Sequence, residues 1–268
     1  MPFPALLFDI GNTTIKIGIA DAAGVAAVYT LPTDPAETAD SLGFKLLELC
    51  RHAGVAPDKL VCCLACSVVP RVDGLLRAAC ARYIRCPVLF APKDVAIALE
   101  NRYQRPQEVG ADRLVTAFAG RRLYDAATLI VVDFGTATTF DCVQDQAYLG
   151  GLICPGVLSS AAALATRTAK LPQVSLELLS PELAVGRSTS ESLNQGLIFG
   201  FASMAEGLIS RLKQSLARPA TPAEAILAIA TGGLAAPIAS VCKCFDHVRP
   251  DLMLEGLRLL VLQTRLGS

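Results

Sequence analysis

The chain has 268 residues, of which 53% are hydrophobic, and its 24 basic side chains balance its 24 acidic ones. This length permits one large domain or two modest ones, and the balanced charge, without a basic stripe interleaved with aromatics, disfavours nucleic-acid binding. Only 2 histidines are present, so a histidine-based triad or a three-histidine metal site is hard to build.

The N-terminal residues, the apolar runs and the cysteine spacings bear on the cellular compartment of the protein. The N-terminal residues lack a charged segment followed by a long apolar core, so we expect no secretory signal. The apolar runs end well short of ~18 residues, so we expect no membrane span. The 10 cysteines lack paired Cys-x-x-Cys spacings, although Cys242 and Cys244 flank Lys243. They are best interpreted as reduced thiols of a cytoplasmic protein, and a zinc site is the disfavoured alternative.

The first half of the chain predicts a three-strand meander and then alternating helices and strands. Hydrophobic patterning and turn residues predict strands at Ala5–Ile10, Thr14–Asp21, Val25–Leu31, Leu60–Ser67 and Pro87–Phe90. Helices are predicted over Thr38–Ala53 and Arg71–Tyr83, and from Gly110 to Tyr124, with an irregular polar stretch at Leu99–Val109 before the last of them.

The second half repeats this pattern. Strands are predicted at Leu129–Asp133, Thr138–Val143, Ala147–Ile153 and Ala225–Ala230, with a last short strand at Val248 and Leu252–Leu254. Helices are predicted at Leu158–Thr168, Ser188–Leu216 and Glu255–Gln263. Each half therefore predicts a mixed sheet with helices on both faces, an α/β class of fold.

A short acidic turn follows the first strand. Asp9 stands where the buried strand Ala5–Ile10 runs out, and Gly11, Thr13 and Thr14 follow it. A glycine allows the backbone to approach a phosphate closely, and the threonines add hydroxyl and N–H donors. The Asp9 carboxylate offers a hard oxygen ligand to Mg²⁺. The turn is therefore a candidate site for an anion beside a metal.

The same turn recurs after the strand Leu129–Asp133. Superposing Asp9 on Asp133 places Gly11 on Gly135 and Thr14 on Thr138, and aligns Asp21 with Asp145. We interpret this as an internal duplication, whose two halves would enclose a cleft with the two turns facing each other. Two unrelated hairpins that share a turn acid and a glycine are the alternative.

Three further stretches carry candidate ligand contacts, each with a simpler explanation. Asp112 and Arg113 open a predicted helix, whose N-terminus attracts anions, but acids are also favoured in any first helical turn. Thr189 lies in the first turn of another helix, where capping or solvation would explain it. Gly232 and Gly233 follow a strand and suit a nearby nucleotide, although a Gly-Gly turn alone is a weak signal.

Taken in order, these motifs resemble a known family. The stretches at residues 9–13, 110–113, 133–141, 150–156 and 231–233 together closely resemble the type III pantothenate kinases, within the actin, sugar kinase and Hsp70 superfamily. The resemblance covers essentially the whole chain. It implies duplicated ribonuclease H-like (actin-like ATPase) domains at residues 1–125 and 126–268, with mixed sheets and an interdomain cleft. One departure is Arg105, where the family often has Asn.

The resemblance implies ATP-dependent phosphorylation of the primary hydroxyl of pantothenate, the first step toward coenzyme A. Phosphoryl transfer depends mainly on positioning and charge neutralisation. Asp9 would hold Mg²⁺, Thr136 would contact ATP, and Asp133 would bind a monovalent cation, K⁺ or NH₄⁺. The phosphates would be wrapped by the first turn and the start of the next strand, namely Asp9, Ile10, Gly11, Asn12, Thr13, Thr14, Ile15 and Lys16.

The resemblance also assigns the acceptor side of the reaction. Asp112 would be the general base, which reverses the simpler explanation given above. The residues that would bind pantothenate are Tyr103, Gly110, Ala111, Asp112, Arg113 and Thr189. The family is homodimeric, with the substrate site close to the subunit interface. Two rivals stay open at this point: another small-molecule kinase of the superfamily, and a non-catalytic regulator, resembling an accessory transcription factor, that keeps the fold.

Overall fold

The structure, a computed structural model, describes residues 3–167, 171–172, 174–178 and 180–264. The chain divides into two compact units, and each is described by itself. Within the described residues, unit 1 comprises 3–99, 105–122 and 252–264, and unit 2 comprises 100–104 and 123–251.

Unit 1 is built on a five-stranded mixed sheet in the order β3-β2-β1-β4-β5. The strands are β1 (Ala5–Ile10), β2 (Thr14–Ala20), β3 (Val25–Pro32), β4 (Cys62–Ser67) and β5 (Val88–Ala91). The first three form an antiparallel meander, and β4 and β5 add in parallel beside β1. The carboxyl ends of β1 and β4 therefore meet at one edge of this sheet, with Asp9 level with Cys66.

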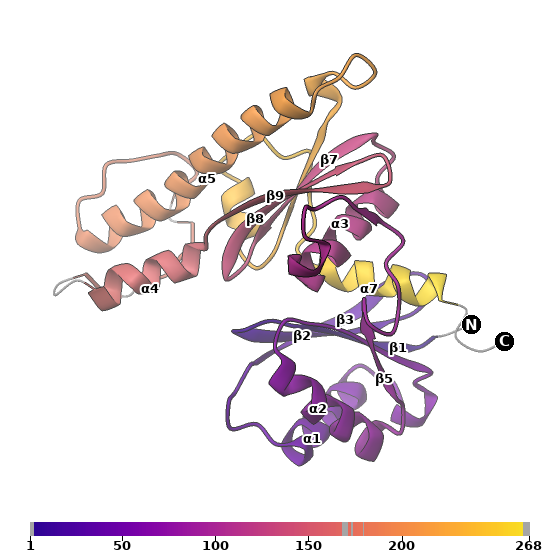
Figure 1. Ribbon diagram of the computed structural model, residues 1–268. Helices are drawn as coiled ribbons and strands as arrows, with labels where there is room; N and C mark the ends of the chain where they lie inside the picture. The colour runs from indigo at the N-terminus through magenta and orange to yellow at the C-terminus, as the bar shows by residue number, and fades with distance from the viewer. Residues whose placement is uncertain (1–2, 168–170, 173, 179, 265–268) are drawn as a thin grey trace. The chain divides into compact units, whose positions relative to one another are not determined.

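Alternation along β1 supplies apolar side chains to both faces of this sheet. Leu6, Phe8 and Ile10 belong to a core shared with α1 (Ala39–His52) and α2 (Pro70–Ala79). The intervening Ala5 and Leu7 belong to a second core, which contains side chains of α3 (Ala111–Leu123) and α7 (Leu252–Gln263). Figure 1 shows α1 and α2 on one side of this sheet and α7 on the other.

Unit 2 is built on a six-stranded mixed sheet in the order β11-β10-β7-β8-β9-β6. The strands are β6 (Glu100–Asn101), β7 (Thr128–Phe134), β8 (Ala137–Gln144), β9 (Ala147–Pro155), β10 (Leu227–Thr231) and β11 (His247–Val248). Here β7, β8 and β9 form the antiparallel meander, and β10 lies parallel to β7.

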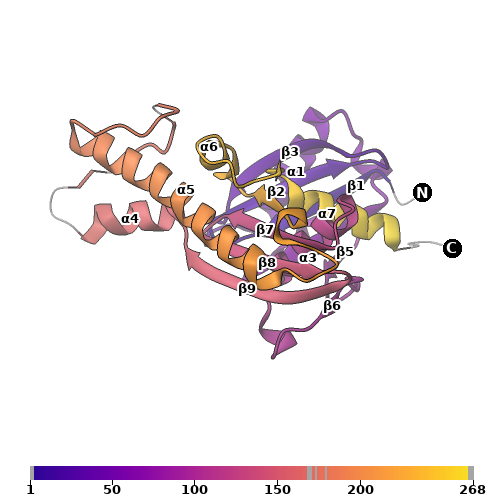
Figure 2. The same cartoon turned by 90° about the horizontal axis from the view of Figure 1, so that it is seen from above.

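Helices of unit 2 cover one face of its sheet. They are α4 (Val157–Arg167), the long α5 (Thr189–Leu216) and the short α6 (Ala235–Ala239). One buried stripe of α5, which includes Ile198, Ala202, Ala205 and Ile209, packs in a core with the inward-facing side chains of β7 and β8. In Figures 1 and 2, α4 runs beside the N-terminal part of α5.

The meander is repeated in the two units, as the duplication predicts. Both sheets have the same arrangement of a meander whose first strand pairs in parallel with a later strand. Both also carry a β-bulge at the same place, between Ile19 and Ala20 in β2 and between Cys142 and Val143 in β8. A shared bulge is not expected of two unrelated hairpins, since bulges are features retained within families.

The residue alignment of the two copies needs one correction. Asp9 pairs across its turn with Lys16, whereas Asp133 pairs with Thr139, so the second turn is one residue shorter. Every expected match downstream of the turns is therefore shifted by one position, and this applies to Thr14 with Thr138 and to Asp21 with Asp145.

Three elements differ from the sequence-based expectation. Leu252–Leu254 is not a strand but the start of α7, where all three side chains are buried. The polar stretch before α3 contains the edge strand β6, and α6 was not expected. The expected second domain, 126–268, also differs from unit 2 at its end, because α7 packs with the sheet of unit 1.

No helix in the described part of the chain combines the length and apolar character that crossing a membrane requires.

Candidate active site

Asp9 lies near the carboxyl end of β1, in the interior of the sheet. Its neighbours across the sheet are Lys16 on β2 and Cys66 on β4. Burial raises the pKa of the Asp9 carboxyl from its ordinary 3.8 to about 6; the positive charge of Lys16 opposes this shift and the negative charge of Asp112 adds to it. A carboxylate held in this way favours a nearby cation.

The turn after Asp9 is braced by one threonine from outside it. Thr33, which is buried, donates its hydroxyl to the Gly11 carbonyl at 2.7 Å, and its N–H donates to the Thr13 carbonyl at 3.0 Å. The Gly11 N–H closes the turn onto the Thr14 carbonyl at 3.0 Å. The backbone carbonyls of the turn are thus held by hydrogen bonds, while the side chains at positions 12–14 are exposed. A fixed turn of this kind suits an anion.

Asp112 lies in the first turn of α3, in the same unit as Asp9. Its Oδ1 accepts a hydrogen bond from the Arg113 N–H at 2.9 Å. A Cβ at position 110 would overlap this same oxygen, so Gly110 makes the carboxylate's position possible. The Arg113 side chain is buried, with 9% of its surface exposed. Ala111 begins the helix.

The negative charges of Asp9 and Asp112 both raise the pKa of one common neighbour, the Cys66 thiol. The pKa of Cys66 is raised well above its ordinary value, mainly by burial, and further by the charges of Asp9, Asp112 and Asp73. The carboxyl ends of β1 and β4 thus face a concentration of negative charge. Sequence reasoning missed Asp73 and Thr33. The break at Pro70 after a parallel strand could have indicated Asp73, because carboxyl ends of adjacent parallel strands converge.

Asp133 occupies the corresponding place in unit 2, near the end of β7. Its Oδ1 lies between two glycines. A Cβ at position 232 would overlap it, and a Cβ at position 135 would lie 3.5 Å away. Gly232 has φ +94°, a conformation that favours glycine, and follows Thr231, which pairs with Asp133 across the sheet. The backbone therefore forms a close cradle around this carboxylate.

Thr136, in the same turn, lies against the start of α4. Its carbonyl accepts a hydrogen bond from the Ser159 hydroxyl at 2.7 Å. A Cβ at position 156 would overlap that carbonyl, so Gly156 lets α4 begin directly beside the turn. The Thr136 side chain is exposed.

Tyr103 lies in unit 2, with its ring against Gly150 of β9. Gly150 has φ +110°, and a Cβ there would lie 2.9 Å from the Tyr103 ring. Beneath it, the buried Tyr148 hydroxyl donates to Asp141 Oδ1 at 2.8 Å, and the two tyrosine rings are 6.4 Å apart between centroids. Thr139 donates to the other oxygen of Asp141 at 3.1 Å. The Tyr103 ring thus packs beside a hydrogen-bonded group formed by Tyr148, Asp141 and Thr139.

Thr189 is the first residue of α5 and is exposed. The capping role belongs to its neighbour, because the Ser188 side chain accepts from the Glu191 N–H at 3.2 Å. The Glu191 side chain in turn accepts from the N–H of Arg187, the residue before the N-cap, at 2.8 Å. Capping therefore does not explain a threonine at position 189.

The structure brings the expected residues together in two groups. Unit 1 holds the residues from Asp9 to Lys16 with Gly110, Ala111, Asp112 and Arg113; unit 2 holds Tyr103, Asp133, Thr136, Thr189, Gly232 and Gly233. Unit 1 alone offers two neighbouring carboxylates beside a fixed turn, which can hold a cation and accept a proton. Among the described residues, no cluster of three or more His, Cys, Asp or Glu side chains is arranged to hold a metal by itself.

Solved structures define the class of fold. A ROK family glucokinase from Streptomyces griseus superposes with a TM-score of 0.53 over 97% of this chain and 99% of its own, at 14% identity. A protein from Sinorhizobium meliloti with a proposed assignment as 2-dehydro-3-deoxygalactonokinase gives 0.59 over 98% of both chains, at 12% identity. A conserved protein from Campylobacter jejuni with a proposed assignment as a Baf family transcriptional activator gives 0.58, at 19% identity, over 96% of this chain and 98% of its own. The chain thus has the actin-like sugar kinase fold.

Sequence comparison identifies the family within this class. The pattern of the type III pantothenate kinase family matches residues 5–211. A type III pantothenate kinase of Oleidesulfovibrio alaskensis is 60% identical over 265 residues, which cover 98% of each chain. That of Lawsonia intracellularis is 47% identical, over 95% of this chain and 94% of its own. The chain belongs to the type III pantothenate kinase family.

Proposed function

We propose that this chain transfers the γ-phosphoryl group of ATP to the primary hydroxyl of pantothenate, the first step toward coenzyme A. The observation that carries the proposal is the pair of carboxylates Asp9 and Asp112 beside a fixed turn in unit 1. Membership of the family supports pantothenate as the acceptor, and the sugar kinase fold supports a nucleotide as the donor.

Asp112 acts as the general base. Oδ1 of its carboxylate is held by the Arg113 N–H, which leaves Oδ2 as the oxygen that accepts the proton of the attacking hydroxyl. Gly110 and Ala111 contribute to the pantothenate site beside the base, and Arg113 binds the acceptor or helps to hold Asp112. Little covalent chemistry is asked of the protein, because phosphoryl transfer depends on alignment and on neutralisation of charge.

Asp9 is the residue that holds Mg²⁺, directly or through water. The fit rests on a buried carboxylate whose pKa is raised to about 6 by burial and by the negative charge of Asp112, since a cation would offset both effects. Bound Mg²⁺ supplies neutralisation of charge on the β- and γ-phosphates. Asn12, Thr13 and Thr14 contact those phosphates, together with the flanking Ile10, Gly11, Ile15 and Lys16.

Asp133 binds a monovalent cation, K⁺ or NH₄⁺. Its Oδ1 sits in a glycine cradle at positions 135 and 232, where backbone oxygens can complete a shell of hard ligands. Thr136 contacts ATP from the same turn, and Gly232 and Gly233 lie near the nucleotide.

Tyr103 and Thr189 bind pantothenate on the unit 2 side. The enzyme works as a homodimer with the substrate site close to the subunit interface, and in the cytoplasm, where cysteine thiols are kept reduced.

Replacement of the base tests the proposal. Asp112→Asn is expected to lower kcat by about 10²- to 10⁴-fold with ATP binding nearly intact, measured as ADP release with pantothenate, MgATP and K⁺. Asp73→Asn is the matched control: it removes a nearby carboxylate from another helix's first turn and should change kcat by less than about 10-fold.

Near-normal turnover by Asp112→Asn would show that Asp112 is not the base. ADP release by the unaltered enzyme without pantothenate would point to another acceptor. No release under any condition would favour a non-catalytic regulator.

A further inference from the structure

Two cysteines of unit 2 lie side by side in the segment between α6 and β11. Cys242 and Cys244 flank Lys243, and their Sγ atoms are 3.6 Å apart, with the Cys244 thiol donating to Cys242. The chain bends at Lys243, which turns both side chains to the same side. Neither residue belongs to the candidate active site, and no disulfide joins them.

Access distinguishes this pair from other neighbouring thiols of the chain. Cys63, Cys80 and Cys86 also lie together, but all three are enclosed in the core of unit 1 between the sheet and its helices. Cys244 is only half-buried and Lys243 is exposed, whereas the Cys242 side chain is 8% exposed. Cys242 itself belongs to the unit 2 core, so a small oxidant approaches the pair from the side of the half-buried Cys244 and the exposed Lys243.

The two sulfurs are also chemically unequal. Hydrogen bonds from the Cys244 thiol and the Cys244 N–H lower the pKa of Cys242, while burial and the nearby Glu206 carboxylate oppose this. The pKa of Cys244 is raised, first because its thiol donates to Cys242 and then by burial. The hydrogen bonds to the Cys242 sulfur therefore favour its thiolate, which is the form that reacts with oxidants.

We propose that Cys242 and Cys244 form a peroxide-sensitive dithiol that closes to an intramolecular disulfide. The Cys242 thiolate attacks hydrogen peroxide, breaking its O–O bond and giving a sulfenic acid and hydroxide. The Cys244 sulfur then attacks the sulfenic sulfur, and the hydroxyl leaves as water. In total, two thiols and one peroxide become one disulfide and two waters, so two electrons pass from the sulfurs to the peroxide.

Closing the disulfide requires the sulfurs to move from 3.6 Å to the bonding distance of about 2.05 Å. The residue after Cys244 connects this movement to the second acidic turn. Phe245 packs edge to face on Phe134, with ring centroids 5.9 Å apart, and Phe134 directly follows Asp133. Asp246 then anchors the segment, because its Oδ2 accepts from the Ala228 N–H at 2.7 Å.

Since Phe245 lies between the dithiol and that anchor, oxidation shifts it against Phe134. We therefore expect closure to disturb the Asp133 turn and to slow turnover. This consequence rests on the proposed function, whereas the reaction of the two sulfurs does not.

The experiment uses the full-length protein, reduced, desalted and treated with hydrogen peroxide near stoichiometric amounts. Trypsin cuts after Lys243, so the two resulting peptides separate when the thiols are reduced and stay joined when Cys242 and Cys244 are linked. We expect a joined pair lighter by two hydrogens, with kcat reduced several-fold and restored by dithiothreitol. Cys244→Ser should stop at a sulfenic acid on residue 242, which dimedone traps.

Cys154→Ser is the control, because Cys154 is the other cysteine of unit 2 that is half-buried rather than enclosed. It should leave both the linkage and the loss of turnover unchanged. Peroxide treatment that oxidises Cys154 or the unit 1 core thiols before linking 242 to 244 would overturn the proposal. A complete linkage with unaltered kcat would overturn the coupling to the Asp133 turn, and an inactive reduced enzyme would instead refute the proposed function.

Discussion

Asp9 combines two demands that oppose each other within one residue. Its position inside the sheet makes the ionised carboxylate costly, while binding a cation requires that ionised form. The pKa of Asp9 is raised to about 6 because burial disfavours the ionised carboxylate that cation binding needs. A group whose pKa is higher in the folded state stabilises the fold only while protonated, so its contribution is lost as the pH rises through about 6.

Asp9→Asn should therefore make the metal-free protein more stable at pH 8 while abolishing turnover. The shift from 3.8 to about 6 sets an upper limit of about 3 kcal/mol on the gain. The gain should disappear below about pH 4, where both side chains are neutral. Urea unfolding at the two pH values measures this, and an equal difference at both would rule out ionisation of Asp9 as the cause.

A glycine determines the position of Tyr103. Gly150→Ala is expected to raise the KM for pantothenate several-fold with little change in the KM for ATP, because the added methyl group would lie 2.9 Å from the Tyr103 ring. Gly54→Ala is the matched control: Gly54 also has positive φ, but its missing side chain would meet open space. Initial rates over both substrates measure the effect; identical changes in the two variants would attribute it to backbone strain alone.

For single residues, the sequence indicated the site's acidic residues and glycines, but it did not indicate the side chains that hold them in position. Asp9, Asp112 and Asp133 stand in recognisable turns, and each occupies the expected position within its element. Thr33 and Asp141 act through contacts with residues 22 and 7 positions away, across strands. Such contacts depend on register, which local patterns do not specify.

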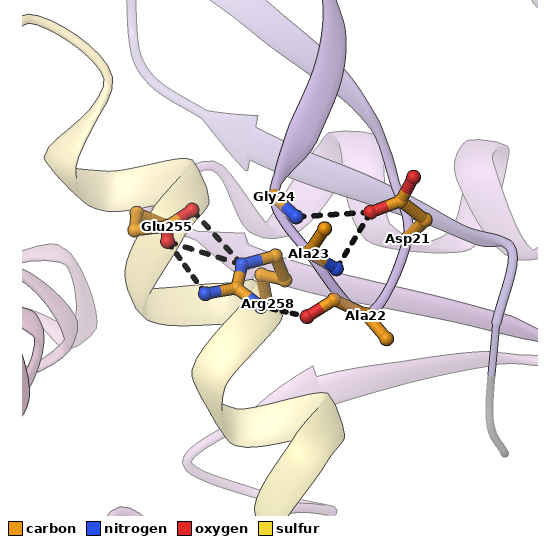
Figure 3. Close-up of polar contacts among 6 residues, drawn as sticks. All are labelled: Asp21, Ala22, Ala23, Gly24, Glu255 and Arg258. Carbon is orange, nitrogen blue, oxygen red and sulfur yellow. Dashed lines mark hydrogen bonds and ion pairs between the residues drawn. The ribbon is translucent and has the colours of Figure 1, made fainter.

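Among the elements, α7 illustrates how a terminal helix is fastened. Arg258, which is 7% exposed, binds Glu255 one turn earlier and donates to the Ala22 carbonyl at 2.9 Å. Figure 3 shows this guanidinium between the helix and the Asp21–Gly24 turn, where Asp21 accepts from the N–H groups of Ala23 and Gly24. The Arg258 guanidinium thus joins α7 to the β2–β3 turn of unit 1 by this hydrogen bond, and its ion pair with Glu255 within α7 holds it in place.

Arg258→Met should lower the free energy of unfolding by about 3–5 kcal/mol, because it leaves the Glu255 carboxylate buried without its partner. Adding Glu255→Met should recover most of the loss. Arg218→Ala, which removes the more exposed Arg218–Asp145 pair, should cost less than about 1 kcal/mol. Denaturant unfolding compares the three; a loss for Arg258→Met no larger than for Arg218→Ala would mean that the pair does not fasten α7.

Most elements follow from local pattern, and the exceptions have identifiable causes. The meander strands were predicted within about two residues because alternation and turn glycines act locally. Leu252–Leu254 was misassigned because a short apolar run suits a strand or a buried helix equally. β6 has only two residues and exists through its pairing with β9, which no local signal reveals.

The whole molecule is divided discontinuously, since unit 1 takes in the described end of the chain. The α7 side chains Leu254, Leu257, Leu260 and Val261 are fully buried in unit 1. At about 1.5–3 kcal/mol each, their burial is worth about 6–12 kcal/mol, comparable with the whole stability of a typical domain. The first unit is therefore not expected to fold without α7.

Deleting residues 252–268 should unfold unit 1, while backbone amides of unit 2 should keep part of their protection from hydrogen exchange. Hydrogen exchange measures this: amides of β1 and β4 should exchange freely, and those of β7 and β8 more slowly. Leu262→Ser, at an exposed position of the same helix, should leave all four strands protected. Protected β1 amides in the truncated chain would contradict the expectation.

The position of α7 also orders events during synthesis. β1 leaves the ribosome before the other strands of the two units, yet α7, which covers one of its faces, is made after all of them. The apolar side chains of Ala5 and Leu7 therefore stay uncovered on that face until α7 has been made. Unit 2 is complete before then, because all of its segments precede residue 252. We therefore expect unit 2, the middle of the chain, to fold first. The early strands of unit 1 should need chaperones until α7 has been made.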